Sequence, residues 1–409
     1  MMEEEKGGLT AVTGFRAAGV EAGIKEEDLD LMLLSCDRGP VPAVGLFTSN
    51  DAKGAPVQVS KNNLESEDNL GAIVVNSGCA NAFTGREGIR NARQMVQTTA
   101  EQLDIKPEEV GVASTGPIGP HLPIKDVEEG IREASEKLSN SWDAGSEAAE
   151  AMTTTDTKIK EAAVSVEMKD GSEVNIGGAA KGAGMIHPDL HATMIGILVT
   201  DANITTAGLR FHLQRSVNRS FNMTTVDRET STNDTVFAMA NGIADNERIT
   251  KKDPNERFQK ALDKVTRDLA KMIAKDGEGA EHLIEVKVEG ANTKEDAQKA
   301  ARTVAGSNLV KASIFGKDPN YGRIVAALGY ADVDFTPSRL SISLIGGESE
   351  APLVLKGETL PGDSIDEPSH VLDMDEIQIY IDLDNGSESA TAWGCDLTTE
   401  YVEINSSYY

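Results

Sequence analysis

Residues 181–200 read Lys181-Gly-Ala-Gly-Met-Ile-His-Pro-Asp-Leu-His-Ala-Thr-Met-Ile-Gly-Ile-Leu-Val-Thr200, a glycine-rich segment that leads through a threonine into an apolar run. The apolar run, residues 194–199, is short and bounded by polar residues, which predicts a strand buried on both faces. Glycine lets the backbone approach atoms that a Cβ would exclude, so we expect a pliable loop before the strand. Thr193 lies between the loop and the strand. A fixed hydroxyl in that setting suits an activated threonine nucleophile.

The rest of the chain alternates strand and helix patterns, as expected for an α/β (α+β) fold of layered sheets flanked by helices. Short buried strands are predicted at residues 31–35, 43–47 and 72–75. Helices are predicted from apolar spacing at residues 89–103, 126–138, 206–219 and 254–274. Residues 107–113 are expected to form a connection between elements.

The sequence pattern changes after Gly279. Apolar and polar residues alternate at 284–288, 340–344 and 377–383, which is typical of half-exposed strands, and a helix is predicted at 294–303. We therefore predict a catalytic domain over residues 1–280 and a smaller α+β C-terminal domain over residues 281–409.

The composition excludes several classes of function. The 409 residues carry a formal charge of −28, and such a field disfavours nucleic acid and anionic membranes as partners. No apolar run approaches the ~20 residues of a membrane span. The three cysteines lie far apart, so neither a disulfide framework nor a cysteine metal site is expected. Because the N-terminus is acidic and does not resemble a signal peptide, we expect a soluble, cytoplasmic protein.

Other sites were weighed for the glycine-rich stretch. A phosphate-binding P-loop requires Ser or Thr after its lysine, whereas Lys181 is followed by glycine. His187, Asp189 and His191 could in principle hold a metal ion, but Pro188 replaces the glutamate of a zinc-protease motif. We therefore predict no metal site. The chain also lacks the Gly-x-Ser-x-Gly motif of serine hydrolases.

Several segments far apart in the chain are rich in hydroxyl and amide side chains, among them residues 114–120, 152–157 and 221–235. Any one Ser or Thr there is accounted for by turn or capping chemistry. Their number in one chain favours a shared polar site. The first of these segments also contains two prolines and two glycines, which predicts a rigid turn with exposed amides.

With these residues assembled, the chain resembles the ornithine acetyltransferase family, also called glutamate N-acetyltransferase, of arginine biosynthesis. Family motifs follow one another in family order along nearly the whole chain. They include Asn76-Ser-Gly-Cys-Ala-Asn-Ala82, Ser114-Thr-Gly116, Met152-Thr-Thr-Thr-Asp-Thr157, Lys181-Gly-Ala-Gly-Met-Ile186, Ala192-Thr-Met194, Thr230-Ser-Thr-Asn-Asp-Thr235, Asp276-Gly-Glu-Gly-Ala280, Asp318-Pro-Asn-Tyr-Gly-Arg323 and Tyr401-Val-Glu-Ile-Asn405.

The resemblance implies an acyltransferase similar in fold to the N-terminal-nucleophile enzymes, which cuts itself between Ala192 and Thr193. Residues 1–192 would form an alpha chain and residues 193–409 a beta chain, and the two chains would stay associated, as a dimer of alpha–beta units. The freed α-amine of Thr193 would act as general base for its own hydroxyl.

The resemblance also implies a ping-pong reaction, in which Thr193 takes the acetyl group of N-acetylornithine and passes it to glutamate. Thr115 and Gly116 match the family's oxyanion hole. The residues that match its substrate contacts are Thr155, Lys181, Thr193, Glu278 and Asn405, the last on a C-terminal tail that would reach the active site. No cofactor is implied. Acetyl-CoA is a second donor that the sequence neither requires nor excludes.

The chain departs from the family pattern by one extra residue near positions 189–191 and by ending at Tyr409 where the family tends to have a further threonine. Thr154 is an alternative to Thr155, because the segment has one more threonine than the family's usual pair. Two other functions stay open from the residues alone. One is an amidohydrolase or aminopeptidase with an N-terminal nucleophile, and the other is an acidic binding protein without catalysis.

Overall fold

The structure, a computed structural model, describes residues 2–187, 194–360 and 366–406, which form two compact units. Of these residues, the first unit contains 2–182, 194–218 and 230–269. The second contains 183–187, 219–229 and the described residues from 270 onward. The predicted domains 1–280 and 281–409 stay a prediction. The units divide the chain differently, since residues 183–187, 219–229 and 270–280, all inside the first range, belong to the second unit.

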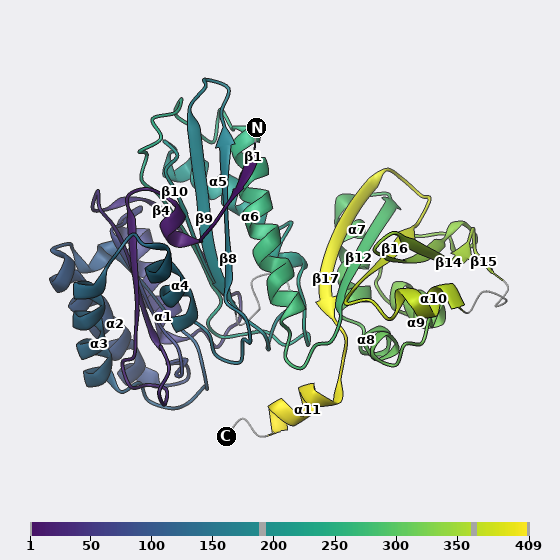
Figure 1. Ribbon diagram of the computed structural model, residues 1–409, viewed down its shortest axis with the longest axis horizontal. Helices are drawn as coiled ribbons and strands as arrows, with labels where there is room; N and C mark the ends of the chain where they lie inside the picture. Colours follow the sequence, from purple (N-terminus) through teal and green to yellow (C-terminus); the bar gives the residue numbers. More distant parts are fainter. Residues whose placement is uncertain (1, 188–193, 361–365, 407–409) are drawn as a thin grey trace. The chain divides into compact units, whose positions relative to one another are not determined.

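Two sheets form the centre of the first unit (Figure 1). The larger sheet consists, in spatial order, of β1 (Met2–Glu5), β8 (Lys160–Glu167), β9 (Glu173–Lys181), β10 (Ile195–Thr200), β11 (Thr235–Ala240), β4 (Val41–Phe47) and β5 (Asn69–Leu70). The smaller sheet consists of β2 (Phe15–Val20), β3 (Leu31–Cys36), β6 (Ala72–Asn76) and β7 (Val110–Ser114). The predicted core strand is confirmed as β10, because all its residues are buried between β9 and β11.

Helices cover the smaller sheet of the first unit. They are α1 (Ala55–Ser66), α2 (Gly85–Leu103), α3 (Ile124–Lys137) and α4 (Trp142–Ala151), and α2 lies beside α3 (Figure 1). One apolar cluster packs α2 and α3 on this sheet, and a second fills the space between the two sheets, where Phe15 and Ile73 meet Ile197 and Phe237. The layered α/β fold class is therefore confirmed. α5 (Thr206–Val217) and α6 (Glu256–Lys275) were also predicted.

Several strands of the first unit were not predicted, among them β7 and β9. β7 replaces part of the expected connection, since Val110–Ser114 pair in parallel with β6. β9 takes up residues 177–181 of the glycine-rich run 177–184, which is therefore only partly a loop. A Cβ on Gly177 would lie 2.1 Å from the Gly8 carbonyl oxygen, and one on Gly178 would lie 2.6 Å from Leu198 Cδ2. These glycines are needed for close packing within and against the sheet.

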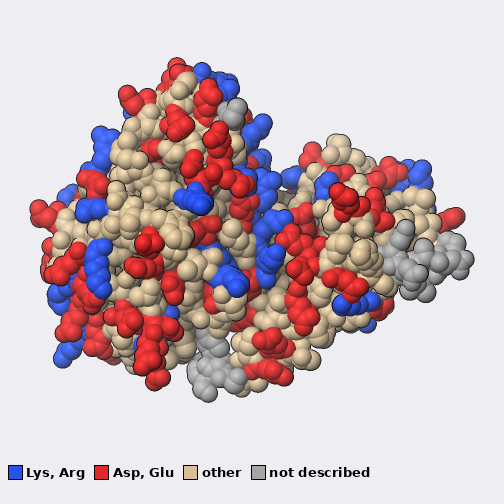
Figure 2. Space-filling view, in the orientation of Figure 1, with Lys and Arg blue, Asp and Glu red and all other residues tan. Residues whose placement is uncertain are grey.

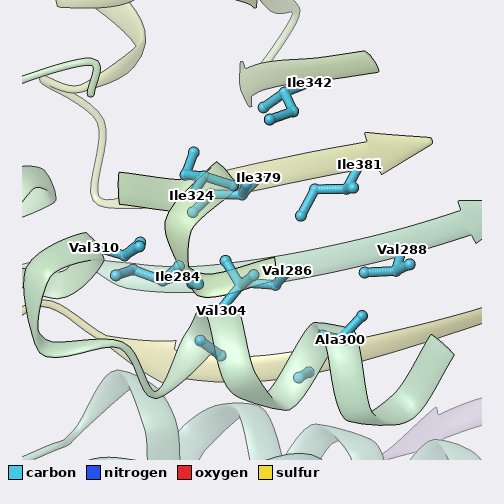
Figure 3. Close-up of a cluster of buried hydrophobic side chains, with 14 of the residues drawn as sticks. Ile284, Val286, Val288, Ala300, Val304, Val310, Ile324, Ile342, Ile379 and Ile381 are labelled. Carbon is cyan, nitrogen blue, oxygen red and sulfur yellow. The ribbon is translucent and has the colours of Figure 1, made fainter. Parts of the chain in front are cut away.

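The second unit is a six-stranded sheet with helices, as predicted for the C-terminal part. Its strands, in spatial order, are β15 (Glu358–Thr359), β14 (Ser349–Leu355), β13 (Ser341–Gly346), β16 (Glu376–Asp382), β12 (Leu283–Ala291) and β17 (Glu388–Cys395). Its helices are α7 (Lys294–Ala305), α8 (Asn308–Phe315), α9 (Tyr321–Gly329), α10 (Asp366–Val371) and α11 (Thr399–Ser406). The alternating pattern is confirmed, because the apolar residues of β12 and β16 point into one core with α7 to α9 (Figure 3).

Acidic and basic side chains are interspersed over the face of the molecule seen in Figure 2. No helix in the described part of the chain is both long and apolar enough to cross a membrane.

Candidate active site

The predicted oxyanion turn follows β7 in the first unit. The Thr115 N–H donates to the Asn76 carbonyl (3.0 Å), and the Thr115 carbonyl accepts from the Cys79 N–H (3.0 Å). Gly116 has φ of +132°, and a Cβ there would lie 2.5 Å from the Cys79 nitrogen. Only glycine fits this backbone. The turn is thus fixed against the loop that leaves β6, at the carboxyl ends of two parallel strands.

A buried cluster of charges lies beside this turn. Lys181 Nζ bonds to Thr115 Oγ1 (3.2 Å) and Thr154 Oγ1 (2.8 Å), and it lies 3.8 Å from Asp156 Oδ2. The other oxygen of Asp156 accepts from Lys160 Nζ at 2.6 Å. The side chains of Lys160, Lys181 and Asp156 are at most 2% exposed. Two lysines and one carboxylate therefore lie together in the interior.

The electrostatics of Asp156 agree with this arrangement. Burial alone would raise the pKa of its carboxyl, but Lys181 and Lys160 lower it, and the net pKa lies well below its usual range. The Gly182 N–H also donates to this carboxylate, at 2.6 Å. Asp156 therefore contacts both lysines and the backbone at the end of β9. A buried cation stabilises negative charge that develops beside it.

Sequence reasoning missed Asp156 and Lys160 as parts of this cluster. Asp156 belongs to the polar segment 152–157, but nothing in the sequence shows that it meets two lysines, one of them 25 residues further along the chain. Thr154, the alternative to Thr155, is the threonine seen bonded to Lys181. Thr155 is half-buried next to it and has interactions of its own. The assignment of Thr155 to substrate stays a prediction.

Two other predicted site residues meet in the second unit. Asn405 Nδ2, on α11, donates to Glu278 Oε2 at 2.8 Å, and it also donates to the Tyr401 carbonyl at 2.9 Å. Glu278 is 8% exposed, and its N–H donates to the Ala183 carbonyl at 2.9 Å. A Cβ on Gly184 would lie 2.3 Å from the Glu278 carboxyl group. The glycine therefore lets the loop approach this carboxylate.

Asp227 holds the same loop from another side, a contact that the sequence did not reveal. Its carboxylate accepts from the backbone N–H groups of Met185 (2.6 Å) and Ile186 (3.0 Å), and Tyr401 Oη donates to it at 3.3 Å. Burial raises the pKa of Asp227 despite these bonds, and burial together with Asp227 raises the pKa of Tyr401. The backbone just before the predicted cleavage segment is thus fixed by side chains.

The predicted nucleophile Thr193, the cleavage partner Ala192, and Asp189 and His191 lie outside the described residues. The first described residue beyond them, Met194, is buried and bonded on both sides of its backbone. Its N–H donates to Asp234 Oδ1 (3.1 Å), and its carbonyl accepts from the Thr235 N–H (3.1 Å).

One group of side chains in the part of the chain that the structure describes has the composition of a metal site. Glu281, His282 and Asp396 offer ligand atoms within 4.8 Å of one another. Asp396, however, accepts from the N–H groups of Glu281 and His282 (3.0 and 3.1 Å) and pairs with His282 Nδ1 (2.8 Å). Its oxygens already join β17 to the start of β12. We assign this group a structural role.

Known proteins match the chain along its length. The model of the ArgJ family matches residues 16–409. The arginine biosynthesis bifunctional protein ArgJ of Symbiobacterium thermophilum is 48% identical over 411 residues, which cover all of both chains. ArgJ 1 of Clostridium acetobutylicum is 48% identical over 401 residues, covering 98% of this chain and 97% of that protein.

Solved structures match parts of the chain. ArgJ of Bacillus halodurans is 35% identical, with a TM-score of 0.44, and covers 46% of this chain and 97% of its own. Ornithine acetyltransferase of Mycobacterium tuberculosis, solved in complex with ornithine, is 36% identical, with a TM-score of 0.43, and covers 46% of this chain and 99% of its own.

Proposed function

The chain belongs to the ArgJ family, whose model matches residues 16–409, and on that premise we propose that it transfers acetyl groups from N-acetylornithine to glutamate. The membership expected from the order of the motifs is confirmed. The chain is accordingly an enzyme of arginine biosynthesis with transferase activity. Its acyl-enzyme mechanism, donor range and assembly are the proposals that follow.

The proposed reaction has two halves. Thr193 Oγ attacks the acetyl carbonyl of N-acetylornithine, the carbonyl carbon–nitrogen bond breaks, and ornithine leaves with the hydroxyl proton. The amine of glutamate then attacks the acetyl-Thr193 ester, Thr193 regains its proton, and N-acetylglutamate leaves. Each half passes through a tetrahedral oxyanion, which needs hydrogen-bond donors or positive charge nearby. The α-amine of Thr193 serves as general base.

The observation that carries this proposal is the contact between Lys181 Nζ and Thr115 Oγ1, at 3.2 Å. It joins a buried cation to the turn whose hydroxyl and glycine N–H match an oxyanion hole. One donor of this kind is typically worth ~3 kcal/mol in the transition state. The register of the sheet supports the placement, because Lys181 pairs with Ile195, two residues beyond Thr193.

We assign the remaining substrate contacts by charge. Thr155 would bind the α-carboxylate, which both amino-acid substrates carry, while Lys181 would contact the substrate at its acetyl group. In the second unit, Glu278 would bind the ornithine ammonium, with Asn405 holding the Glu278 carboxylate through the bond described above. Glu278→Gln should therefore weaken the binding of N-acetylornithine more than the binding of glutamate. The KM values of the two substrates, measured by steady-state kinetics, would show this difference.

Maturation and assembly belong to the same proposal. We propose cleavage between Ala192 and Thr193, giving chains 1–192 and 193–409 that remain associated, in a cytoplasmic dimer of alpha–beta units. No bound cofactor takes part. A second activity, acetyl transfer from acetyl-CoA to glutamate, is favoured by the word bifunctional in the names of the relatives. Rates measured with acetyl-CoA and glutamate, without N-acetylornithine, test it.

The test of the main activity uses N-acetylornithine with and without glutamate. Transfer predicts that ornithine release becomes continuous only when glutamate is present, and that N-acetylglutamate accumulates with it. Acetate released at the same rate without glutamate would instead identify the amidohydrolase that shares this type of nucleophile.

A further inference from the structure

Asp234 is buried immediately before β11 and has no part in the function described so far. Its side chain is 0% exposed, and Oδ1 accepts from the Met194 N–H at 3.1 Å. Oδ2 has no hydrogen-bond partner among the residues that the structure describes. A buried, unpartnered carboxyl oxygen costs stability, so its presence calls for a reason.

The position of Asp234 follows from the sheet. β10 and β11 are parallel, with Ile195 paired to Thr235, so Met194 and Asp234 are the residues just before the two strands. The Thr235 N–H donates to the Met194 carbonyl at 3.1 Å, while the Met194 N–H is satisfied by the Asp234 side chain. Asp234 thus supplies the acceptor for the Met194 N–H, which belongs to the peptide group between Thr193 and Met194.

The carboxyl group is suited to this task in its neutral form. Burial raises the pKa of Asp234 well above its usual range, although the Met194 N–H, the Ser231 hydroxyl and the Lys181 charge lower it in part. A neutral acid still accepts through one oxygen, and it places no full negative charge beside a nucleophile.

We propose that Asp234 is a positioning residue for the nucleophile: it holds the Met194 amide and so fixes the peptide group that joins Thr193 to Met194. A peptide group is planar, so a bond to its N–H orients the carbonyl and the Cα atoms on either side. Displacing a reacting group by about 1 Å can cost ~10²-fold in rate. The inference rests on the proposed function, because it assumes that Thr193 carries the acetyl group.

The other end of β10 provides a matched control. Asp201 follows Thr200 and is also buried, and burial raises the pKa of its carboxyl too. It accepts from the Asn175 N–H (2.7 Å) and from Asn175 Nδ2 (2.8 Å). Both of its oxygens therefore join the same sheet at the end far from Thr193 along the strand. Changes there should affect stability alone.

The experiment compares Asp234→Asn, Asp234→Ala and Asp201→Asn in the full-length chain. For each variant we would measure the melting temperature, the extent of self-cleavage, the kcat per cleaved molecule and the KM. Asn keeps a neutral acceptor of the same shape, so kcat should stay within about threefold of wild type. Ala removes the acceptor, so cleavage should slow and kcat should fall about ten- to hundredfold, with KM changed less than about twofold. Asp201→Asn should lower the melting temperature and leave kcat unchanged.

The outcomes separate the inference from the proposed function. A folded Asp234→Ala chain with wild-type cleavage and kcat overturns the positioning role while transfer by the wild type stands. A folded Asp234→Asn chain without activity overturns it as well, because the acceptor is then not the feature that matters. If Asp234→Ala fails to fold, Asp234→Ser replaces it, judged by the same split between kcat and KM. A wild-type chain that neither cleaves nor transfers overturns both.

Discussion

Lys181 is held by two threonine hydroxyls and faces Asp156, inside a cluster that retains a second lysine. Lys181→Met keeps most of the side-chain length and removes the charge. We predict that kcat falls about a hundredfold, since one charged donor near the oxyanion is worth ~3 kcal/mol. Thermal unfolding should shift little, because Lys160 still neutralises Asp156.

Lys264→Met is the control. It removes a lysine that is paired with Glu4 and Asp268 on a more exposed surface, and it should leave kcat unchanged. Full activity of Lys181→Met would contradict the role given to this cation.

Asp156 gives a prediction about acid stability. The lysines hold its folded pKa below the ordinary value of 3.8, so the carboxylate stabilises the fold above that pH and loses this effect as the pH falls through the lower folded pKa. Asp156→Asn leaves two buried lysines without their counterion, which typically costs about 3–5 kcal/mol. Urea unfolding at pH 7 should show that loss, and the gap between variant and wild type should narrow below about pH 4. A gap that is independent of pH would argue against the ion pairs.

At the scale of elements, the oxyanion turn can be tested with two of its own glycines. Gly116→Ala would place a Cβ 2.5 Å from the Cys79 nitrogen, whereas a Cβ on Gly119 meets nothing within 4 Å. Both glycines have positive φ, so each alanine carries backbone strain of about 1–3 kcal/mol. We expect Gly116→Ala to lose at least about a hundredfold in kcat because the turn must move. Gly119→Ala should lose stability and keep most of its activity. Equal activity of the two variants would show that this turn is not the oxyanion hole.

The elements also show what the sequence could predict. β10 and α6 could be predicted from local patterns. β10 is a short apolar run and α6 has an apolar stripe at helical spacing, and both patterns are visible in the residues of the element itself. β9 was not predicted because its glycines are required by close contacts with Gly8 and Leu198, which come from other parts of the chain.

The same division holds for the site. Motif order predicted Thr115, Lys181, Glu278 and Asn405 as site residues. The structure brings the first two together in one unit and the last two together in the other. Asp156, Asp227 and Asp234 accept from backbone N–H groups remote in sequence, and Asp156 also faces the remote Lys181, so no local pattern could assign these contacts.

For the whole molecule, the net charge of −28 is the strongest departure from an average protein. Like charges on one folded chain repel each other, and added salt screens that repulsion. The melting temperature should therefore rise by several degrees between about 0.02 and 0.5 M NaCl at pH 7. A melting temperature that falls with salt would mean that ion pairs outweigh the repulsion.

The central claim is that Thr193 becomes a chain terminus and carries the acetyl group. Intact-mass spectrometry of the purified protein, before and after mixing with N-acetylornithine in the absence of glutamate, tests it most directly. Self-cleavage and acyl transfer at Thr193 predict two fragments, 1–192 and 193–409. The second fragment alone should gain one acetyl group and lose it when glutamate is added. Thr193→Ala should give a single chain that gains no acetyl group. An uncut wild-type chain with full transfer activity, or an acetyl group carried elsewhere, would contradict the account.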